Sequence, residues 1–279
     1  MLSLGLDLSE RPVRAVVVSD RGEVVSRASG ESGAEAVRAA AAGQALDAAG
    51  IAALDGKDGT IAIPGVKTAA RCSPGAAAMA AEAWIGAAKG MRHAICLHIG
   101  DEIYAGLLLD GKPWTGGHGR AGAAAWLALN PVERQDYRKL GSLAAEVSAG
   151  GIARRLSWRI QAGDRSRVLD AAGGSLDAIT GQHVFDGARG GDGVAISVVR
   201  DTAKYIGMAV ATLAAAIDPE VIIVSGSVAV ADLMIEPVRQ ECARRLPPDA
   251  MNDLRVEFST LGLDEVAIGA ARLAFNPKA

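Results

Sequence analysis

The first thirty residues alternate apolar and polar positions with the period of two that is typical of a half-buried β-strand. The segment "LSLGLDLS" places leucine at every second position from Leu2 to Leu8. Two further apolar segments, "VRAVVVS" and "EVVSRAS", follow, and the turn sequence Asp20-Arg21-Gly22 separates them. Because turn residues of this kind connect adjacent strands, the pattern predicts a three-stranded meander.

Alanine-rich segments with helical spacing then alternate with short apolar runs. The spacing predicts a helix over 33–49 that ends at Gly50, and a second over 201–217 that is ended by Asp218-Pro219. Two more helices are predicted in "EPVRQECARRL" and "LGLDEVAIGAARLAF". A further Ala-rich helix is expected to start after "RCSP" and to include Glu82. Strands are predicted in 59–65, 93–100, "IYAGLLLDGKPW", "EVIIVSGS" and "LRVEFST". The alternation predicts an α/β fold in two lobes.

Composition excludes several classes of protein. Half of the 279 residues are hydrophobic, but no run has the 18 or more consecutive apolar residues of a membrane span. The net charge is −3 with both signs interspersed, so no basic surface points to nucleic acid. Three widely spaced cysteines fit neither a disulfide framework nor a metal site. We expect a cytoplasmic protein with no nucleic-acid or membrane partner.

Two features together suggest a family. The chain opens with a strand that ends in Asp and is followed by a meander ("GLDLSERPVRAVVVSDRGEVV"), and later carries "GMAVATLAAAIDPEVIIVSGSVA". This resembles the ROK family (repressors, open reading frames and sugar kinases) within the actin-like ATPase superfamily. The resemblance implies a two-lobed ribonuclease-H type fold, with mixed sheets flanked by helices and a ligand cleft between the lobes. It also implies a homodimer, an N-terminal lobe over 1–92 plus 262–279, and a C-terminal lobe over 93–261.

The sequence departs from the family at the position of the catalytic base. ROK kinases carry Asn-Asp at the start of the helix that ends in Glu, and that Asp is the general base. Glu82 matches the helix Glu, so Ser73 and Pro74 occupy the Asn-Asp positions. Proline cannot accept a proton, and Glu82 lies roughly 12 Å further along a helix with a rise of about 1.5 Å per residue.

The two phosphate loops of the family are also changed. The family's first loop is Asp-x-Gly-Gly-Thr, whose glycines let backbone N–H groups approach a phosphate. Here Asp7 is present, but Ser9, Glu10 and Arg11 replace Gly-Gly-Thr. The second loop, Gly-Thr-Gly-x-Gly, becomes "GDEIY" from Gly100 to Tyr104. Added carboxylates repel a triphosphate by about 1 kcal/mol per close pair in bulk water, and by more in a cleft.

The substrate and zinc motifs differ as well. Ala123, Ala125 and Trp126 replace the Glu, Gly and His of Gly-Glu-x-Gly-His, and no cysteine lies in 127–142, where the zinc cluster should follow. Only residues 66–72 lie between "AIPG" and Ser73, whereas sugar kinases of this family have several tens of residues there. We therefore predict no zinc and no competent ATP-dependent sugar kinase of the usual mechanism.

Several candidate site residues remain. We predict that four carboxylates converge in the cleft and favour a divalent metal or an amine: Asp7, Glu10, Asp101 and Glu102. In the structural alternative, Asp7 is a turn acid, and Asp101-Glu102 form a solvated hairpin turn. His118, in a Gly-rich loop, is a candidate base or ligand contact, or a loop histidine without a role.

Other residues have structural alternatives. Trp126 is a candidate substrate contact, although core packing is favoured for Trp114 and Trp126. Ser225-Gly226 matches the family's adenine turn, and the same turn is needed simply to leave the strand. Structural roles are favoured for His93 and His98, and a solvated face is favoured for the segment that contains Arg154 and Arg155.

Three functions follow from these departures. The first is a pseudokinase that binds a small molecule or a partner and has a regulatory role. The second is an enzyme that reuses the cleft for ATP-independent chemistry on a sugar-like or amine-bearing metabolite, with Asp7, Asp101, Glu102 and His118 as candidate catalytic residues. The third is a residual ATP-dependent kinase. The first is favoured, because no complete nucleophile–base pair is found in the sequence.

Overall fold

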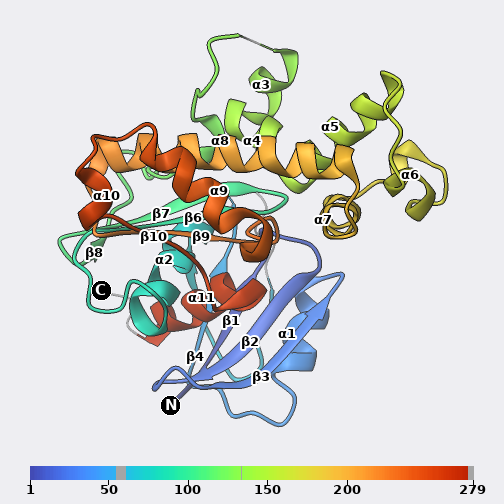
Figure 1. Ribbon diagram of the computed structural model, residues 1–279. Helices are drawn as coiled ribbons and strands as arrows, with labels where there is room; N and C mark the ends of the chain where they lie inside the picture. The colour runs from blue at the N-terminus through green and yellow to red at the C-terminus, as the bar shows by residue number, and fades with distance from the viewer. Residues whose placement is uncertain (55–60, 133, 276–279) are drawn as a thin grey trace. The chain divides into compact units, whose positions relative to one another are not determined.

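The computed structural model describes residues 1–54, 61–132 and 134–275, and the chain forms two compact units. Unit 1 comprises Met1–His98, Tyr104–Gly122 and Ser259–Ala279, and unit 2 comprises Ile99–Ile103 and Ala123–Phe258. Each unit is built from α-helices and β-strands (Figure 1).

The first sheet of unit 1 begins with the meander that the alternating leucines predict. Strands β1 (Leu2–Asp7), β2 (Val13–Ser19) and β3 (Val24–Gly30) pair in antiparallel fashion. Strands β4 (Ala48–Ala52) and β5 (Ala70–Cys72) are added in parallel, which gives the order β3-β2-β1-β4-β5. The carboxyl ends of β1, β4 and β5 therefore meet at one edge of the sheet.

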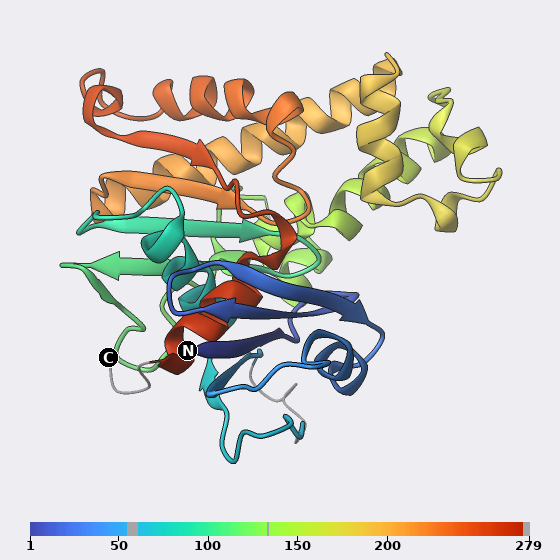
Figure 2. The ribbon, with the colours of Figure 1, turned by 90° about the horizontal axis from the view of Figure 1, so that it is seen from below.

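Helices cover both faces of this sheet (Figure 2). On β2, Val17 packs in the hydrophobic core with α1 (Gly33–Ala40), whereas Val18 packs in the core that contains α11 (Glu265–Phe275) and part of α2 (Pro74–Ile85). Successive residues of a strand point to opposite faces, so burial on both sides explains why β2 is a nearly continuous apolar run.

Glycine allows α11 to approach its neighbours at backbone distance. A Cβ atom at Gly269 would lie 1.7 Å from the carbonyl oxygen of Ala77 in α2. Cβ atoms at Gly5 and Gly50 would lie 1.8 and 1.9 Å from carbonyl oxygens of α11. Because real Cβ atoms do not approach so closely, only glycine at these three positions permits the packing.

Two predictions in this region were wrong. The helix predicted over 33–49 ends at Ala40, and 48–52 form strand β4 instead, because Gly43 has a positive φ of 74° and Gly50 lies beneath α11. The strand predicted over 59–65 lies partly outside the described residues, and in 61–65 only an isolated bridge between Ile63 and Val66 is found.

The second sheet has the strand order β10-β9-β6-β7-β8. The strands are β6 (Ala94–Ile99), β7 (Ile103–Leu109), β8 (Lys112–Pro113), β9 (Val221–Ser225) and β10 (Arg255–Phe258). All of them except the short β8 were predicted as separate strands, and a turn with positive φ at Asp110 and Gly111 follows β7.

Helices make up most of unit 2. They are α3 (Gln135–Leu140), α4 (Ser142–Val147), α5 (Ala149–Gln161), α6 (Val168–Ala171), α7 (Gly181–Arg189), α8 (Gly193–Ile217), α9 (Ala231–Ala243) and α10 (Ala250–Asp253). Helix α8 begins eight residues earlier than predicted, because Asp192 caps its N-terminus. Asp218 ends it in a left-handed conformation. Of the helices described, none has the length and apolarity needed to span a membrane.

Candidate functional site

The start of α2 carries no group that can act as a base. Ser73 is the N-cap residue, and its Oγ accepts a hydrogen bond of 3.2 Å from the backbone N–H of Ala76. Pro74 is the first helical residue. Beside them, burial and then the charge of Asp7 raise the pKa of the Cys72 thiol to about 12. At neutral pH the side chains of Cys72, Ser73 and Pro74 are therefore all uncharged.

Asp7, at the end of β1, is a buried turn acid. Its Oδ1 accepts hydrogen bonds from the backbone N–H and the hydroxyl of Ser9, at 2.8 and 2.6 Å. Burial raises the pKa of Asp7 above its usual value, although the two bonds from Ser9 and the charge of His98 lower it. The geometry is that of the turn-acid alternative, in which the carboxylate organises the loop after β1.

Side chains fill the region next to Asp7. The Ser9 hydroxyl lies 3.3 Å from the phenol oxygen of Tyr104, whose ring stacks on the imidazole of His98 with centroids 4.6 Å apart. Glu10 Oε1 lies 3.4 Å from His98 Nε2. We call Ser9, Glu10, His98 and Tyr104 the polar cluster. Its members come from the loop after β1, from β6 and from β7.

The positive charge of the polar cluster resides on His98. On its other side His98 Nδ1 lies 3.6 Å from Glu265 at the start of α11, and both side chains are buried. Burial lowers the pKa of His98, but the hydrogen bonds and charges of Glu10 and Glu265 outweigh it and raise the pKa to about 9. Glu265 also accepts a hydrogen bond of 3.2 Å from the Cys96 thiol. One cation thus lies between two carboxylates in an ion-pair network in the interior of unit 1.

Glu82, the carboxylate in α2, has a structural role. It is fully buried, and it accepts hydrogen bonds from the Ser259 hydroxyl at 2.5 Å and from the backbone N–H of Ala87 at 2.8 Å. Burial and then the charge of Glu265 raise the pKa of Glu82 to about 7.

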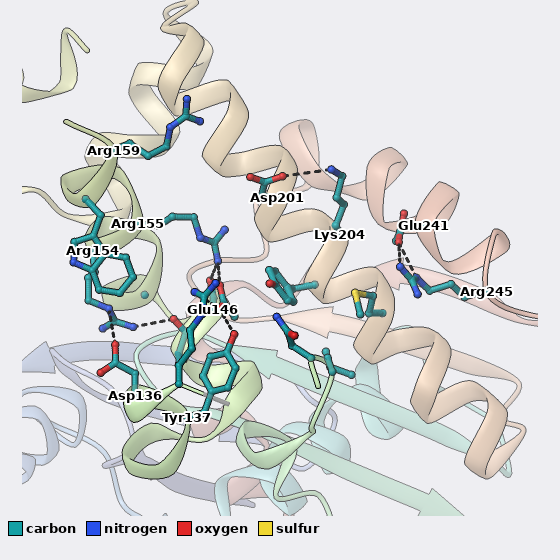
Figure 3. Close-up of a pocket in the computed structure, with 18 residues that line it drawn as sticks. Asp136, Tyr137, Glu146, Arg154, Arg155, Arg159, Asp201, Lys204, Glu241 and Arg245 are labelled. Carbon is teal, nitrogen blue, oxygen red and sulfur yellow. Dashed lines mark hydrogen bonds and ion pairs between the residues drawn. The ribbon is translucent and has the colours of Figure 1, made fainter. Parts of the chain in front are cut away.

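A cavity of about 650 Å³ lies within unit 2, between the helices α3, α4, α5, α8 and α9 (Figure 3). This volume is in the range of small-molecule sites. Arg154 and Arg155, on α5, both line it. The prediction that these two arginines belong to a solvated face was wrong, because the Arg155 side chain is only 15% exposed.

Charged side chains dominate the cavity wall. The described lining includes six cationic residues, Arg134, Arg154, Arg155, Arg159, Lys204 and Arg245. It includes four acidic residues, Asp136, Glu146, Asp201 and Glu241.

Glu146 is the most buried of these charges. Arg155 Nη2 donates to Glu146 Oε2 at 2.6 Å, Arg134 Nη1 donates to Oε1 at 3.3 Å, and the Tyr137 hydroxyl donates to the same Oε1. The sequence analysis missed Glu146. A sequence signal for a buried ion pair was available: Glu146 is the one carboxylate inside the apolar run "LAAEV", and Arg154 and Arg155 follow in the next helix.

Comparison with known proteins identifies the family. The sequence model of the ROK family matches residues 71–276. The chain belongs to the ROK family.

Curated relatives of this ROK protein include the glucokinase of Halalkalibacterium halodurans, which is 30% identical over 69% of this chain and 59% of its own length. The glucokinase of Streptomyces coelicolor is 30% identical over 71% of this chain and 65% of its own length. The match therefore spans less than two thirds of either relative. A crystal structure of a ROK family glucokinase from Streptomyces griseus, in complex with glucose and AMPPNP, superposes over 99% of both chains with a TM-score of 0.84 and 25% identity. The predicted ROK-type α/β fold is thus confirmed.

The four candidate carboxylates of this ROK protein belong to different units. Asp7 and Glu10 belong to unit 1, whereas Asp101 and Glu102 lie in unit 2, in the turn between β6 and β7. The convergence of these four carboxylates stays a prediction. Among the described residues, no group of three or more His, Cys, Asp and Glu side chains has an arrangement that could hold a metal.

His118, the other candidate base, is exposed in the Gly-rich loop after β8. Ser225 is buried at the end of β9, and Gly226 follows with a φ of 93°. A Cβ at Gly226 would lie 2.4 Å from the carbonyl oxygen of Ile99, so the turn itself requires glycine. Nucleotide binding at this turn stays a prediction.

The two tryptophans near the altered substrate motif do not pack in the core. Trp114 is 47% exposed and Trp126 is 58% exposed. The prediction of core packing was therefore wrong for both. Trp126 is the last residue of a single turn of 3₁₀-helix, Ala124–Trp126, and its side chain lies at the surface. A substrate contact of Trp126 stays a prediction.

Proposed function

We propose that this ROK protein is a pseudokinase, a sugar-kinase-like protein that binds a small molecule and does not transfer phosphate from ATP. The observation that carries the proposal is the polar cluster. Ser9, Glu10 and Tyr104 stand at positions that match glycines of the two phosphate loops, and they contact one another or His98. The backbone approach that a phosphate needs is thus replaced by buried side chains that are bonded to each other.

The start of α2 supports the same conclusion. A general base must lie within hydrogen-bond reach of the proton that it takes. The matched position is Pro74, the neighbouring Ser73 hydroxyl caps the helix, and Glu82 is bonded to Ser259 inside the unit. The two hydrogen bonds that Asp7 Oδ1 accepts from Ser9 support a structural role for this carboxylate as well.

A turnover assay tests the proposal. We expect the purified chain, supplied with Mg·ATP and a panel of glucose, N-acetylglucosamine and N-acetylmannosamine, to release no more ADP with sugar than without it. The variant Pro74→Asp should not restore activity, since the phosphate positions stay filled. An active ROK glucokinase assayed in parallel is the positive control.

One result would overturn the proposal. Sugar-dependent ADP release that disappears in the variant Asp7→Asn would show kinase activity of this chain, whereas release that persists in this variant would come from a contaminating kinase. The homodimer is part of the same proposal, and light scattering of the eluted protein tests it.

A further inference from the structure

We infer that the cavity of unit 2 (Figure 3) binds a small organic anion through the guanidinium groups of Arg134 and Arg154, with Arg155 as a positioning residue. The inference rests on this cavity alone and does not depend on the loss of kinase activity. The ligand is defined by its chemistry, as a compound of fewer than about twenty heavy atoms that carries a phosphate or carboxylate group, in keeping with the size of such pockets.

The balance of charge in the cavity favours an anion. The described lining carries six cationic and four acidic side chains, although the whole chain has a net charge of −3. Ion pairs account for much of this charge, because Lys204 lies 3.4 Å from Asp201 and Arg245 lies 2.7 Å from Glu241. Arg159 lies 2.6 Å from Asp164, which is not part of the described lining. The excess of positive charge lies elsewhere in the cavity.

That excess surrounds Glu146. One carboxylate there serves two guanidinium groups, since Arg155 and Arg134 both donate to it, and the Tyr137 hydroxyl adds a third donor. Arg154 Nε lies 3.4 Å from Asp136, the other carboxylate of this region. Three guanidinium groups thus share two carboxylates. A further cation would have to compete with these guanidinium groups for the same two carboxylates. An anion adds the missing negative charge.

Aromatic rings hold the three guanidinium groups in place. The Arg134 guanidinium carbon lies 5.8 Å from the centre of the Tyr137 ring. The corresponding distances are 5.4 Å from Arg154 to Trp158 and 5.6 Å from Arg155 to Tyr205. A ring that covers the flat face of a guanidinium leaves its N–H edges available, and these edges recognise the oxygen atoms of phosphate and carboxylate.

The arginines differ in how many donors remain. Each guanidinium has five N–H donors. Arg155 uses donors for Glu146 and Thr202, and Arg154 Nη2 donates to the carbonyl oxygen of Ala145 at 2.9 Å. Arg134 is half exposed, and the bond described for it uses one donor. Arg134 and Arg154 are therefore the residues that contact the anion, and Arg155 positions Glu146 beneath them.

Calorimetric titration of the full chain tests this inference. The probes are inorganic phosphate, glycerol 3-phosphate and citrate, with glycerol as the neutral control, all at constant ionic strength. We expect saturable binding of at least one anion and none of glycerol. Tighter binding of the phosphates than of citrate assigns the site to phosphate compounds, and the reverse order assigns it to carboxylates.

Variants distinguish this site from general effects of anions on the protein. Arg134→Gln and Arg154→Gln should each weaken binding at least fivefold, and the double variant should abolish it. Arg255→Gln is the matched control, because Arg255 is half exposed, pairs with Glu257 and lies outside the cavity. It should bind as the wild type does. The inference is overturned if no anion binds saturably, or if the two cavity variants bind as tightly as Arg255→Gln.

Discussion

The variant Gly269→Ala is expected to lower the free energy of unfolding of unit 1 by about 3 kcal/mol or more, an effect at the upper end of those measured for core overpacking. A Cβ atom at this position would lie 1.7 Å from the carbonyl oxygen of Ala77 and 2.4 Å from its carbonyl carbon. Both are backbone atoms of α2, so no side chain can rotate away. Helices α2 and α11 must separate, and the core that they share must loosen.

Helix propensity predicts the opposite sign, which makes the test decisive. Alanine is a better helix former than glycine by about 1 kcal/mol. Gly150 in α5 is the matched control, because a Cβ there meets nothing within 4 Å, and Gly150→Ala should leave stability unchanged or raise it slightly. Urea unfolding of the two variants measures the difference. A Gly269→Ala protein within 1 kcal/mol of the wild type contradicts the close packing described for α11.

Replacement of His98 is expected to have the second large effect, and this effect depends on pH. His98→Gln removes the cation between Glu10 and Glu265 and leaves buried carboxylates without their partner, which costs about 3–5 kcal/mol. The stacking on Tyr104 is lost as well. His118→Gln, in the exposed loop, is the matched control and should change stability by less than about 0.5 kcal/mol.

The direction of the pH effect follows from the raised pKa of His98. The folded state holds the proton up to a pKa of about 9, whereas the unfolded state releases it near 6.5. Protonation of His98 therefore contributes stability that is fully present below pH 6.5 and is lost as the pH rises towards 9. A shift of this size corresponds to roughly 3 kcal/mol.

Denaturant unfolding between pH 6 and pH 10 measures this contribution as the difference between the wild type and His98→Gln. The difference should be largest at pH 6 and should shrink as the pH rises. The neighbouring groups Tyr104 and Glu82 titrate in both proteins and largely cancel, whereas Asp7 does not cancel fully because the charge of His98 lowers its pKa. If the variant does not fold, the imidazole resonances of the wild type give the pKa of His98 directly. A pKa at or below 6.5 rules out the charged network.

Local pattern predicted seven of the ten described strands and five of the eleven described α-helices, and tertiary packing explains the failure at β4. The period of two appears in the burial of β3, where half-buried and exposed residues alternate, whereas β2 is buried on both faces. The Ala-rich segment 33–49 was predicted to be one helix, since alanine favours helices. Residues 48–52 form β4 instead because small residues are needed beneath α11, and α11 lies more than 200 residues further along the chain.

The candidate site was predicted only in part. Comparison with the family motifs identified Ser9, Glu10 and Tyr104 as departures, but it placed Glu10 in an acidic cluster that would favour a metal or an amine. The structure pairs Glu10 with His98, which is 88 residues away in the chain and whose type alone indicates no particular partner. The cavity of unit 2 was missed for the same reason, because Glu146 and Arg155 come together only when α4 packs against α5.

The most direct test of the filled phosphate positions is calorimetric titration of the purified chain with Mg·ATP. The buried contacts among Ser9, Tyr104, His98 and Glu10 predict no saturable heat up to millimolar nucleotide. Saturable binding at millimolar or lower concentration, weakened by Asp7→Asn, would contradict the proposal that these side chains have replaced the phosphate site.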